Sequence, residues 1–212
     1  MMPVCVQPEP AKFDERVRQR GHRWLVDKGW AMGAPAPDAS ALPTYWRETQ
    51  RELWSAYGGV CAYLCIFFEW ASGASSTDHF VAKSVNAGQA YEWDNFRLSC
   101  MGANRNKGRF DDVLDPFAMS EFAFELNLAN GEMLPGRHLA LDDAVRGMAM
   151  TTIERLHLND VETAGMRAQH VTDYLNRDVS ADYLRRRSPF VWAELVRQGV
   201  IVQSSAIVHA SP

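Results

Sequence analysis

The spacing of hydrophobic positions predicts that the C-terminal half of the chain is largely helical. In the segment 141–156, apolar side chains and one threonine recur at intervals of four, three, four and four residues, which places them on one face of a helix. A second stripe of small and aliphatic residues spans 161–175, and these two helices are expected to pair as a hairpin. Shorter helices are predicted at 182–187 and 190–197, and 200–209 is expected to be a strand or a tail.

The N-terminal half alternates between proline-rich and apolar segments. Residues 1–44 hold six prolines around one amphipathic stretch at 13–24, which indicates an irregular arm that carries a short helix. Residues 45–54 have helical spacing, and the aromatic-rich run 60–70 is expected to be a buried strand or a turn followed by a strand. The expected regions are the arm at 1–44, a core with its preceding helix at 45–118, and a helical region at 119–212.

Composition places the chain among folded proteins and restricts its binding partners. Of the 212 residues, 47% are hydrophobic and 23% are charged, which is close to the average for globular proteins. The formal net charge of −4 argues against a protein that coats nucleic acid through a general basic field, so any phosphate contact must come from a local patch. We find no apolar run long enough for a membrane span and no secretory leader, so the expected location is the cytoplasm, with no membrane partner.

Four polar residue types follow one another at fixed intervals in the middle of the chain. Asp78-His79 precedes Asn95, Asn104 comes nine residues after Asn95, and Lys107 follows three residues later. Each has an ordinary structural explanation: the Asp-His pair as a satisfied surface or core pair, Asn95 as a turn residue, and Asn104 as a helix cap. Their joint occurrence in this order needs a further explanation.

This ordered set resembles the signature of the HNH endonuclease family, over about 61–116. The family has an Asp-His pair on one strand, an Asn on the next, and Asn or His followed by x-x-Lys at the start of a helix. The spellings around Asp78, Asn95 and Asp115-Pro116 look most like the HNH nucleases of bacterial anti-phage defence, of Septu and retron type. The resemblance implies an α+β fold, with a small ββα-metal nuclease core embedded in a mainly helical domain.

The resemblance also implies a role for each residue of the set. Asp78 and Asn104 would hold a single Mg²⁺ or Mn²⁺, His79 would be the general base, and Asn95 would orient its imidazole by a hydrogen bond. Elementary chemistry agrees: oxygen donors suit these hard cations, and an imidazole can exchange a proton near neutral pH. An Asp and a His adjacent on a strand point to opposite faces, so their convergence requires a strand end.

Basic residues surround this set and are the expected contacts to nucleic acid. Arg97, Arg105, Lys107 and Arg109 form a local positive cluster in the sequence, which can bind phosphates even though the whole chain is acidic. Lys83-Ser84 either faces phosphate as well or belongs to a solvated loop.

Cysteine spacing predicts that the chain has no structural zinc. Many HNH proteins bind zinc with two C-x-x-C knuckles, but here Cys61 and Cys65 are one residue too far apart, and Ala103 stands where the partner of Cys100 belongs. Aromatic side chains around Tyr63 are expected to pack in place of the metal. A further departure from the family is Ala82, where proline is usual.

The function expected from the sequence is metal-dependent hydrolysis of phosphodiester bonds in DNA, with RNA as the other possible substrate. Resemblance to the defence nucleases implies a companion ATPase as partner. The alternative is a catalytically weak or inactive module of the same fold that binds nucleic acid or docks a partner. DNA binding without metal-stimulated cleavage would favour that alternative.

Overall fold

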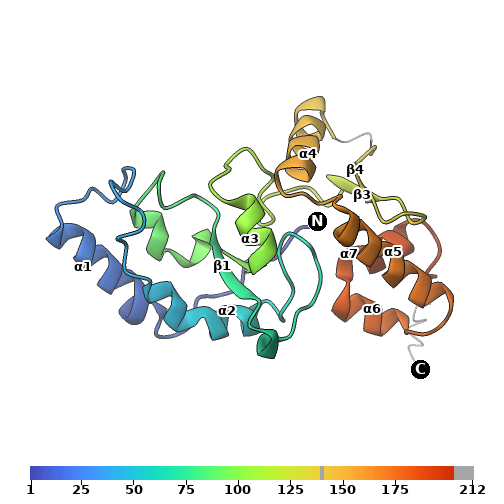
Figure 1. Ribbon diagram of the computed structural model, residues 1–212, viewed down its shortest axis with the longest axis horizontal. Helices are drawn as coiled ribbons and strands as arrows, with labels where there is room; N and C mark the ends of the chain where they lie inside the picture. The colour runs from blue at the N-terminus through green and yellow to red at the C-terminus, as the bar shows by residue number, and fades with distance from the viewer. Residues whose placement is uncertain (139–140, 203–212) are drawn as a thin grey trace, which may run out of the picture.

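The computed structural model describes residues 1–138 and 141–202 and has an α+β fold (Figure 1), which confirms the expected class. None of the helices in this described part is long and apolar enough to cross a membrane. The helices are η1 (Asp14–Arg18), α1 (Gln19–Asp27), η2 (Tyr45–Thr49), α2 (Gln50–Ala56), η3 (Trp70–Ser72), η4 (Gly88–Tyr91), η5 (Trp93–Asn95), α3 (Met101–Lys107), α4 (Asp143–Arg155), α5 (Val161–Leu175), α6 (Ala181–Arg187) and α7 (Pro189–Arg197). The strands are β1 (Ser75–His79), β2 (Phe96–Cys100), β3 (Phe124–Leu126) and β4 (Met133–Pro135).

The centre of the molecule is an antiparallel hairpin of β1 and β2 followed directly by α3. Its register pairs Asp78 with Arg97 and His79 with Phe96. Since α3 begins one residue after β2 ends, the helix folds back against both strands. Gly108 follows α3 with a positive φ of 52° and ends the helix. The structure therefore contains a two-strand-plus-helix unit at the position that the sequence predicts.

The N-terminal arm is packed onto this unit rather than projecting from it. The backbone N–H of Val4 donates to the Pro116 carbonyl at 2.8 Å, and the Trp93 indole N–H donates to the Gln7 carbonyl at 2.8 Å. Phe13 is fully buried, with its ring edge-on to that of Trp93. The helical part of the arm, η1 with α1, is slightly longer than expected.

The aromatic-rich run 60–70 forms a turn closed by a single β-bridge between Val60 and Phe67. The Cys61 N–H donates to the Ile66 carbonyl at 2.9 Å, and Cys65 has a positive φ of 52°, which reverses the chain within a few residues. The expected apolar burial is present, but the extended segment is only a bridge, because the turn between its two halves leaves no room for a longer ladder.

The C-terminal helices form where their hydrophobic spacing predicts them, but α4 and α5 do not pair as a hairpin. In Figure 1, α4 lies above the β3–β4 hairpin, and α5 lies beside α6 and α7; the contacts agree, with α4 packed on β4 and α5 on α6 and α7. The buried Arg167 guanidinium of α5 donates to the Gly131 carbonyl at 2.7 Å and so fixes the turn between β3 and β4. Most of the predicted strand or tail at 200–209 falls outside the described residues.

Candidate functional site

Three of the residues singled out in the sequence line one pocket of about 220 Å³. Asp78 and His79 come from the end of β1, and Asn104 comes from the middle of α3. Because β1 ends at His79, the chain turns there, and the two neighbouring side chains of the Asp-His pair both reach the pocket. Lys83 and Arg109 line the same pocket.

The Asp78 carboxylate is 2% exposed and lies between a hydroxyl and an ammonium group. The buried Tyr63 hydroxyl donates to Oδ2, and Lys107 Nζ lies 3.6 Å from Oδ1. Burial raises the pKa of Asp78, while the positive charge of Lys107 and the Tyr63 hydrogen bond oppose that rise. The net rise means that the negative charge is incompletely compensated, so a further cation in the pocket would be favoured.

The imidazole of His79 is held in one orientation by a backbone carbonyl. Its Nε2 lies 3.0 Å from the Ala90 oxygen, and the ring packs edge-on against Trp46 at a centroid distance of 4.7 Å. A carbonyl can only accept, so Nε2 carries the proton and Nδ1 keeps its lone pair. Burial, followed by the charge of Lys83, lowers the pKa of His79 to about 3, so the ring is neutral at neutral pH. The neutral ring therefore has one nitrogen anchored and the other with a free lone pair.

The side-chain amide of Asn104 is fixed through its nitrogen. Nδ2 donates to the Ser76 hydroxyl and, at 3.4 Å, to the Thr77 carbonyl, both on β1. Because the amide group is planar, Oδ1 is directed to the opposite side, and no hydrogen-bond donor contacts it within 1–138 and 141–202. Asn104 therefore lines the pocket with its Oδ1 free of hydrogen bonds from the described residues.

The donor set fits the divalent ion that the sequence resemblance implies. Asp78 and Asn104 offer oxygen atoms, which Mg²⁺ and Mn²⁺ prefer, and these ions keep several waters and take substrate phosphate as further ligands. No cluster of three or more His, Cys, Asp or Glu side chains suited to a metal occurs among the described residues. A site with two protein oxygen ligands is of the open kind that Mg²⁺ occupies.

The side chain of Asn95 forms no hydrogen bond with the imidazole, contrary to its expected role. Its Oδ1 accepts from the Val81 N–H at 2.7 Å, and its Nδ2 donates to the carbonyls of Val81 at 3.0 Å and Gln89 at 2.8 Å. These bonds close the loop between β1 and η4, whose residue Ala90 anchors His79. Asn95 is a positioning residue that acts on His79 through the loop.

Arg97 is buried and paired with protein groups, so it is not a phosphate contact in this structure, which corrects the prediction from its sequence position. It is 4% exposed, and its Nε and Nη2 donate to the two carboxylate oxygens of Asp115 at 2.8 and 2.7 Å. Nη1 donates to the Asp94 carbonyl at 2.6 Å, and the guanidinium lies 3.5 Å from the centre of the Phe117 ring. The side chain joins β2 to the segment after α3.

Lys107 is buried as well, so it is not a phosphate contact in this structure. The residue has 0% exposure, and Nζ donates to the carbonyls of His79 at 2.9 Å and Phe80 at 2.6 Å. Together with its approach to Asp78, these bonds tie α3 to the end of β1. The lysine therefore stabilises the end of β1 without lining the pocket itself.

The cations that remain available to a ligand are Arg105, Arg109 and Lys83. Both arginines are exposed, and Arg109 lines the pocket. Lys83, from the loop after β1, also lines it, with its Nζ 4.4 Å from the centre of the Trp46 ring. Burial, followed by the nearby charge of Arg47, lowers the pKa of Lys83. The sequence left Lys83 open between phosphate and solvent, and the structure places it at the pocket.

Sequence reasoning missed the Tyr63 hydroxyl, the Ala90 carbonyl and the Trp46 ring as parts of the site. Tyr63 was expected to be an apolar packing residue, and it is fully buried, but its hydroxyl is bonded to Asp78. Its place fifteen residues before Asp78 carries no periodic or motif signal. The Ala90 contribution is a backbone atom, which no residue type reveals.

Cys5 is exposed on the arm, whereas Cys61 and Cys65 belong to the turn at 61–65 and Cys100 ends β2. The Cys100 N–H donates to Cys61 Sγ at 3.5 Å, and the side chain of Cys65 is buried. Burial acts to raise the pKa of Cys61, but hydrogen bonds from Cys100 and from backbone amides lower it. The thiols of Cys61, Cys65 and Cys100 are therefore part of the packing between the turn and β2.

The site combines a fixed neutral imidazole, two oxygen donors and a cationic rim within a single pocket. These features come from the chain itself and do not depend on a relative. Neither a scan against models of known protein families nor a search of curated proteins found a match to this chain.

Proposed function

We propose that the protein is a metal-dependent endonuclease that hydrolyses phosphodiester bonds in DNA. The observation that carries the proposal is the convergence of Asp78, His79 and Asn104 on one pocket, although they come from different parts of the ββα unit. A lone Asp-His pair would fit many structural explanations, but an uncommitted amide oxygen and a base of fixed tautomer beside it serve hydrolysis.

His79 acts as the general base. Nδ1 takes a proton from a water molecule, the water oxygen forms a bond to phosphorus, and the bond from phosphorus to the leaving sugar oxygen breaks. The leaving oxygen then takes a proton from a second water molecule. The Ala90 carbonyl stabilises the imidazolium that forms, since Nε2–H already donates to it. The negative charge of a bound phosphate also favours protonation of the ring and so acts against the effect of burial and of Lys83.

Asp78 and Asn104 hold the divalent ion. When bound, that ion supplies positive charge to the phosphate and to the leaving oxygen. Tyr63 and Lys107 keep the Asp78 carboxylate oriented, and Ser76 keeps the Asn104 oxygen turned away from β1. The protein thus prepares the ligand geometry before substrate arrives.

The rim of the pocket binds the nucleic-acid backbone. Lys83 and Arg109 both line the pocket, and Arg105 adds an exposed positive charge on α3. The choice of DNA follows from the resemblance to anti-phage nucleases. The same resemblance favours a companion ATPase that controls cutting.

The test is nicking of supercoiled plasmid with and without Mg²⁺. We expect cleavage that requires the metal, and a loss of about 10²-fold or more in His79→Ala, since general-base catalysis contributes on that order. His157→Asn is the matched control, because His157 is exposed at a φ of 54° and asparagine tolerates that backbone. A His79→Ala protein that is folded by circular dichroism and cleaves at the full rate would refute the proposal.

A magnesium titration separates ligand loss from base loss. Asn104→Ala is expected to raise the Mg²⁺ concentration needed for half-maximal nicking, whereas His79→Ala lowers the rate at saturating metal. Asn106→Ala is the control, since Asn106 lies on α3 but bonds the Leu156 carbonyl instead of lining the pocket. DNA binding without metal-stimulated cleavage by the unmodified protein would favour the non-catalytic binding module.

A further inference from the structure

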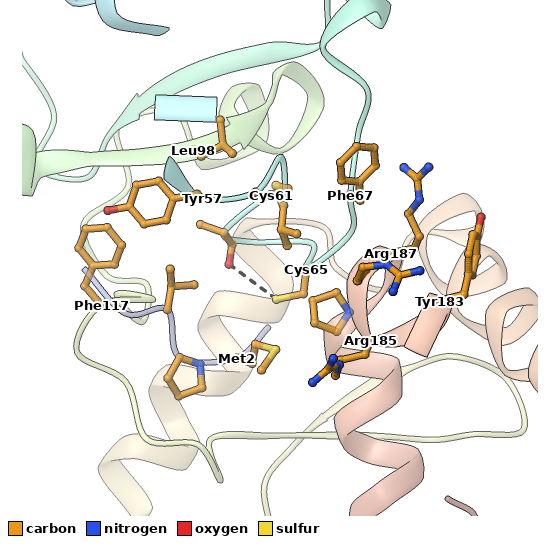
Figure 2. Close-up of a pocket in the computed structure, with 17 residues that line it drawn as sticks. Met2, Tyr57, Cys61, Cys65, Phe67, Leu98, Phe117, Tyr183, Arg185 and Arg187 are labelled. Atoms are coloured by element: carbon orange, nitrogen blue, oxygen red, sulfur yellow. Dashed lines mark hydrogen bonds between the residues drawn. The ribbon is translucent and has the colours of Figure 1, made fainter. Parts of the chain in front are cut away.

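A second, larger cavity shares no described lining residue with the candidate nuclease site. Its volume is about 720 Å³, within the range of about 300–1,000 Å³ typical of small-molecule sites. Figure 2 shows Tyr57, Leu98 and Phe117 toward one side of the cavity, Tyr183, Arg185 and Arg187 of α6 toward the other, and Cys61 and Cys65 between them.

The walls of this cavity are held by backbone hydrogen bonds. On the side of the arm, the Val4 N–H donates to the Pro116 carbonyl at 2.8 Å. On the side of α6, the Phe67 N–H donates to the Arg187 carbonyl at 2.9 Å. Because segments far apart in sequence are pinned in this way, the cavity is preformed, and a ligand would bind without having to order its walls.

The interior of the cavity is apolar. Val60, Leu98, Phe67 and Phe117 contribute aliphatic and aromatic surface. Such a lining favours a ligand body that gains free energy by leaving water. It offers few groups that could read the polar edge of a nucleobase.

The charged residues that line the cavity within the described part of the chain are all positive. Within the described residues the lining contains Arg185, Arg186 and Arg187, and neither aspartate nor glutamate. Arg187 already donates to Glu69 at 3.0 Å, but Arg185 has only a contact of 3.6 Å with Asp182, an exposed residue. Arg186 forms no ion pair within the described part of the chain. Two guanidinium groups at the cavity are therefore available to an anion.

We propose that this cavity binds an organic anion with an apolar body, of the class of long-chain carboxylates. The chain of the ligand lies against Leu98 and the aromatic side chains, and its carboxylate pairs with Arg185 and Arg186. A guanidinium matches a carboxylate in both charge and geometry. The inference does not depend on the proposed nuclease activity.

Isothermal titration calorimetry of the full chain with decanoate, below its micelle concentration, tests this site, with decanol as the neutral analogue. Arg185→Gln/Arg186→Gln removes the available charges, and Val4→Trp fills the cavity from the arm. Arg23→Gln/Lys28→Gln removes the same charge from exposed positions at α1, at the opposite end of the molecule in Figure 1.

We expect saturable decanoate binding that weakens at least fivefold in the double arginine variant and at least tenfold in Val4→Trp, with no change in the α1 control. Decanol binding should respond to Val4→Trp alone. Circular dichroism and thermal unfolding verify that each variant is folded. Absence of binding at about 1 mM decanoate, or equal affinity in all the variants, would overturn the proposal.

Discussion

Replacing Arg97 by methionine tests whether this residue is structural or binds nucleic acid. The change keeps an unbranched side chain but removes the guanidinium that bonds both oxygens of Asp115. Breaking a buried ion pair by removing one partner costs about 3–5 kcal/mol. The Asp115 side chain is 21% exposed and still accepts from the Phe117 N–H at 3.0 Å, so we expect the lower end, about 3 kcal/mol.

The measurement is urea unfolding followed by circular dichroism. A loss of about 3 kcal/mol corresponds to a fall in Tm of about 6–12 °C for a chain of this length. The double variant Arg97→Met/Asp115→Asn should recover part of the loss, because it removes the orphaned charge while keeping the side chain that caps the turn.

The same variants separate stability from DNA affinity. At a temperature where all are folded, Arg105→Gln and Arg109→Gln should each reduce the slope of log affinity against log salt by about 1. Arg97→Met should leave that slope unchanged. A destabilisation below about 1 kcal/mol together with a reduced slope for Arg97→Met would show that the guanidinium faces phosphate, and the structural assignment would be wrong.

Three further predictions concern stability. Lys107→Met removes the cation next to Asp78 and should cost about 3 kcal/mol at pH 7 but less at pH 4, where the carboxyl is closer to neutral, as urea unfolding at both pH values can verify. Gly131→Ala should cost about 2 kcal/mol, because Gly131 has a φ of 73° and its Cβ would meet a carbonyl of α5; Gly33→Ala, in open space, should be near neutral in the same assay. His79 has a pKa of about 3 when folded and about 6.5 when unfolded, so the unfolded chain binds more protons between these values. In metal-free buffer, stability should therefore fall by about 2 kcal/mol from pH 7 to pH 5, and His79→Gln should lack this component; an identical fall in both proteins would contradict it.

The order of polar residues along the chain predicted the pocket, because a site of this kind accepts only a few residue types at each position. Asp78, His79 and Asn104 do share one pocket. The cations were assigned less well, since the sequence shows that Arg97 is charged but not that Asp115, eighteen residues later, neutralises it. Lys107 matched the motif, but its side chain is buried and its ammonium group donates hydrogen bonds to two backbone carbonyls.

Helix positions followed from periodicity, whereas helix contacts did not. The stripes on α4 and α5 marked the buried faces only in part, since Met148, Val161 and Leu175 are exposed, and a stripe does not identify its partner. The β3–β4 hairpin separates the two helices, and its three-residue strands are too short to produce a clear alternation in the sequence. Likewise, Asn95 was assigned to the imidazole, because residue type alone does not reveal that its amide closes a loop.

The turn at 61–65 contributes residues to the larger cavity and to the candidate site. Cys61 and Ala62 form part of the wall of the larger cavity, while the next residue, Tyr63, bonds the Asp78 carboxylate. A ligand that displaces the turn would therefore also move the hydroxyl that orients this carboxylate. By thermodynamic linkage, any factor by which such a ligand changes divalent-ion affinity is the factor by which the ion changes affinity for the ligand. The turn at 61–65 is thus the structural connection between the larger cavity and the candidate site.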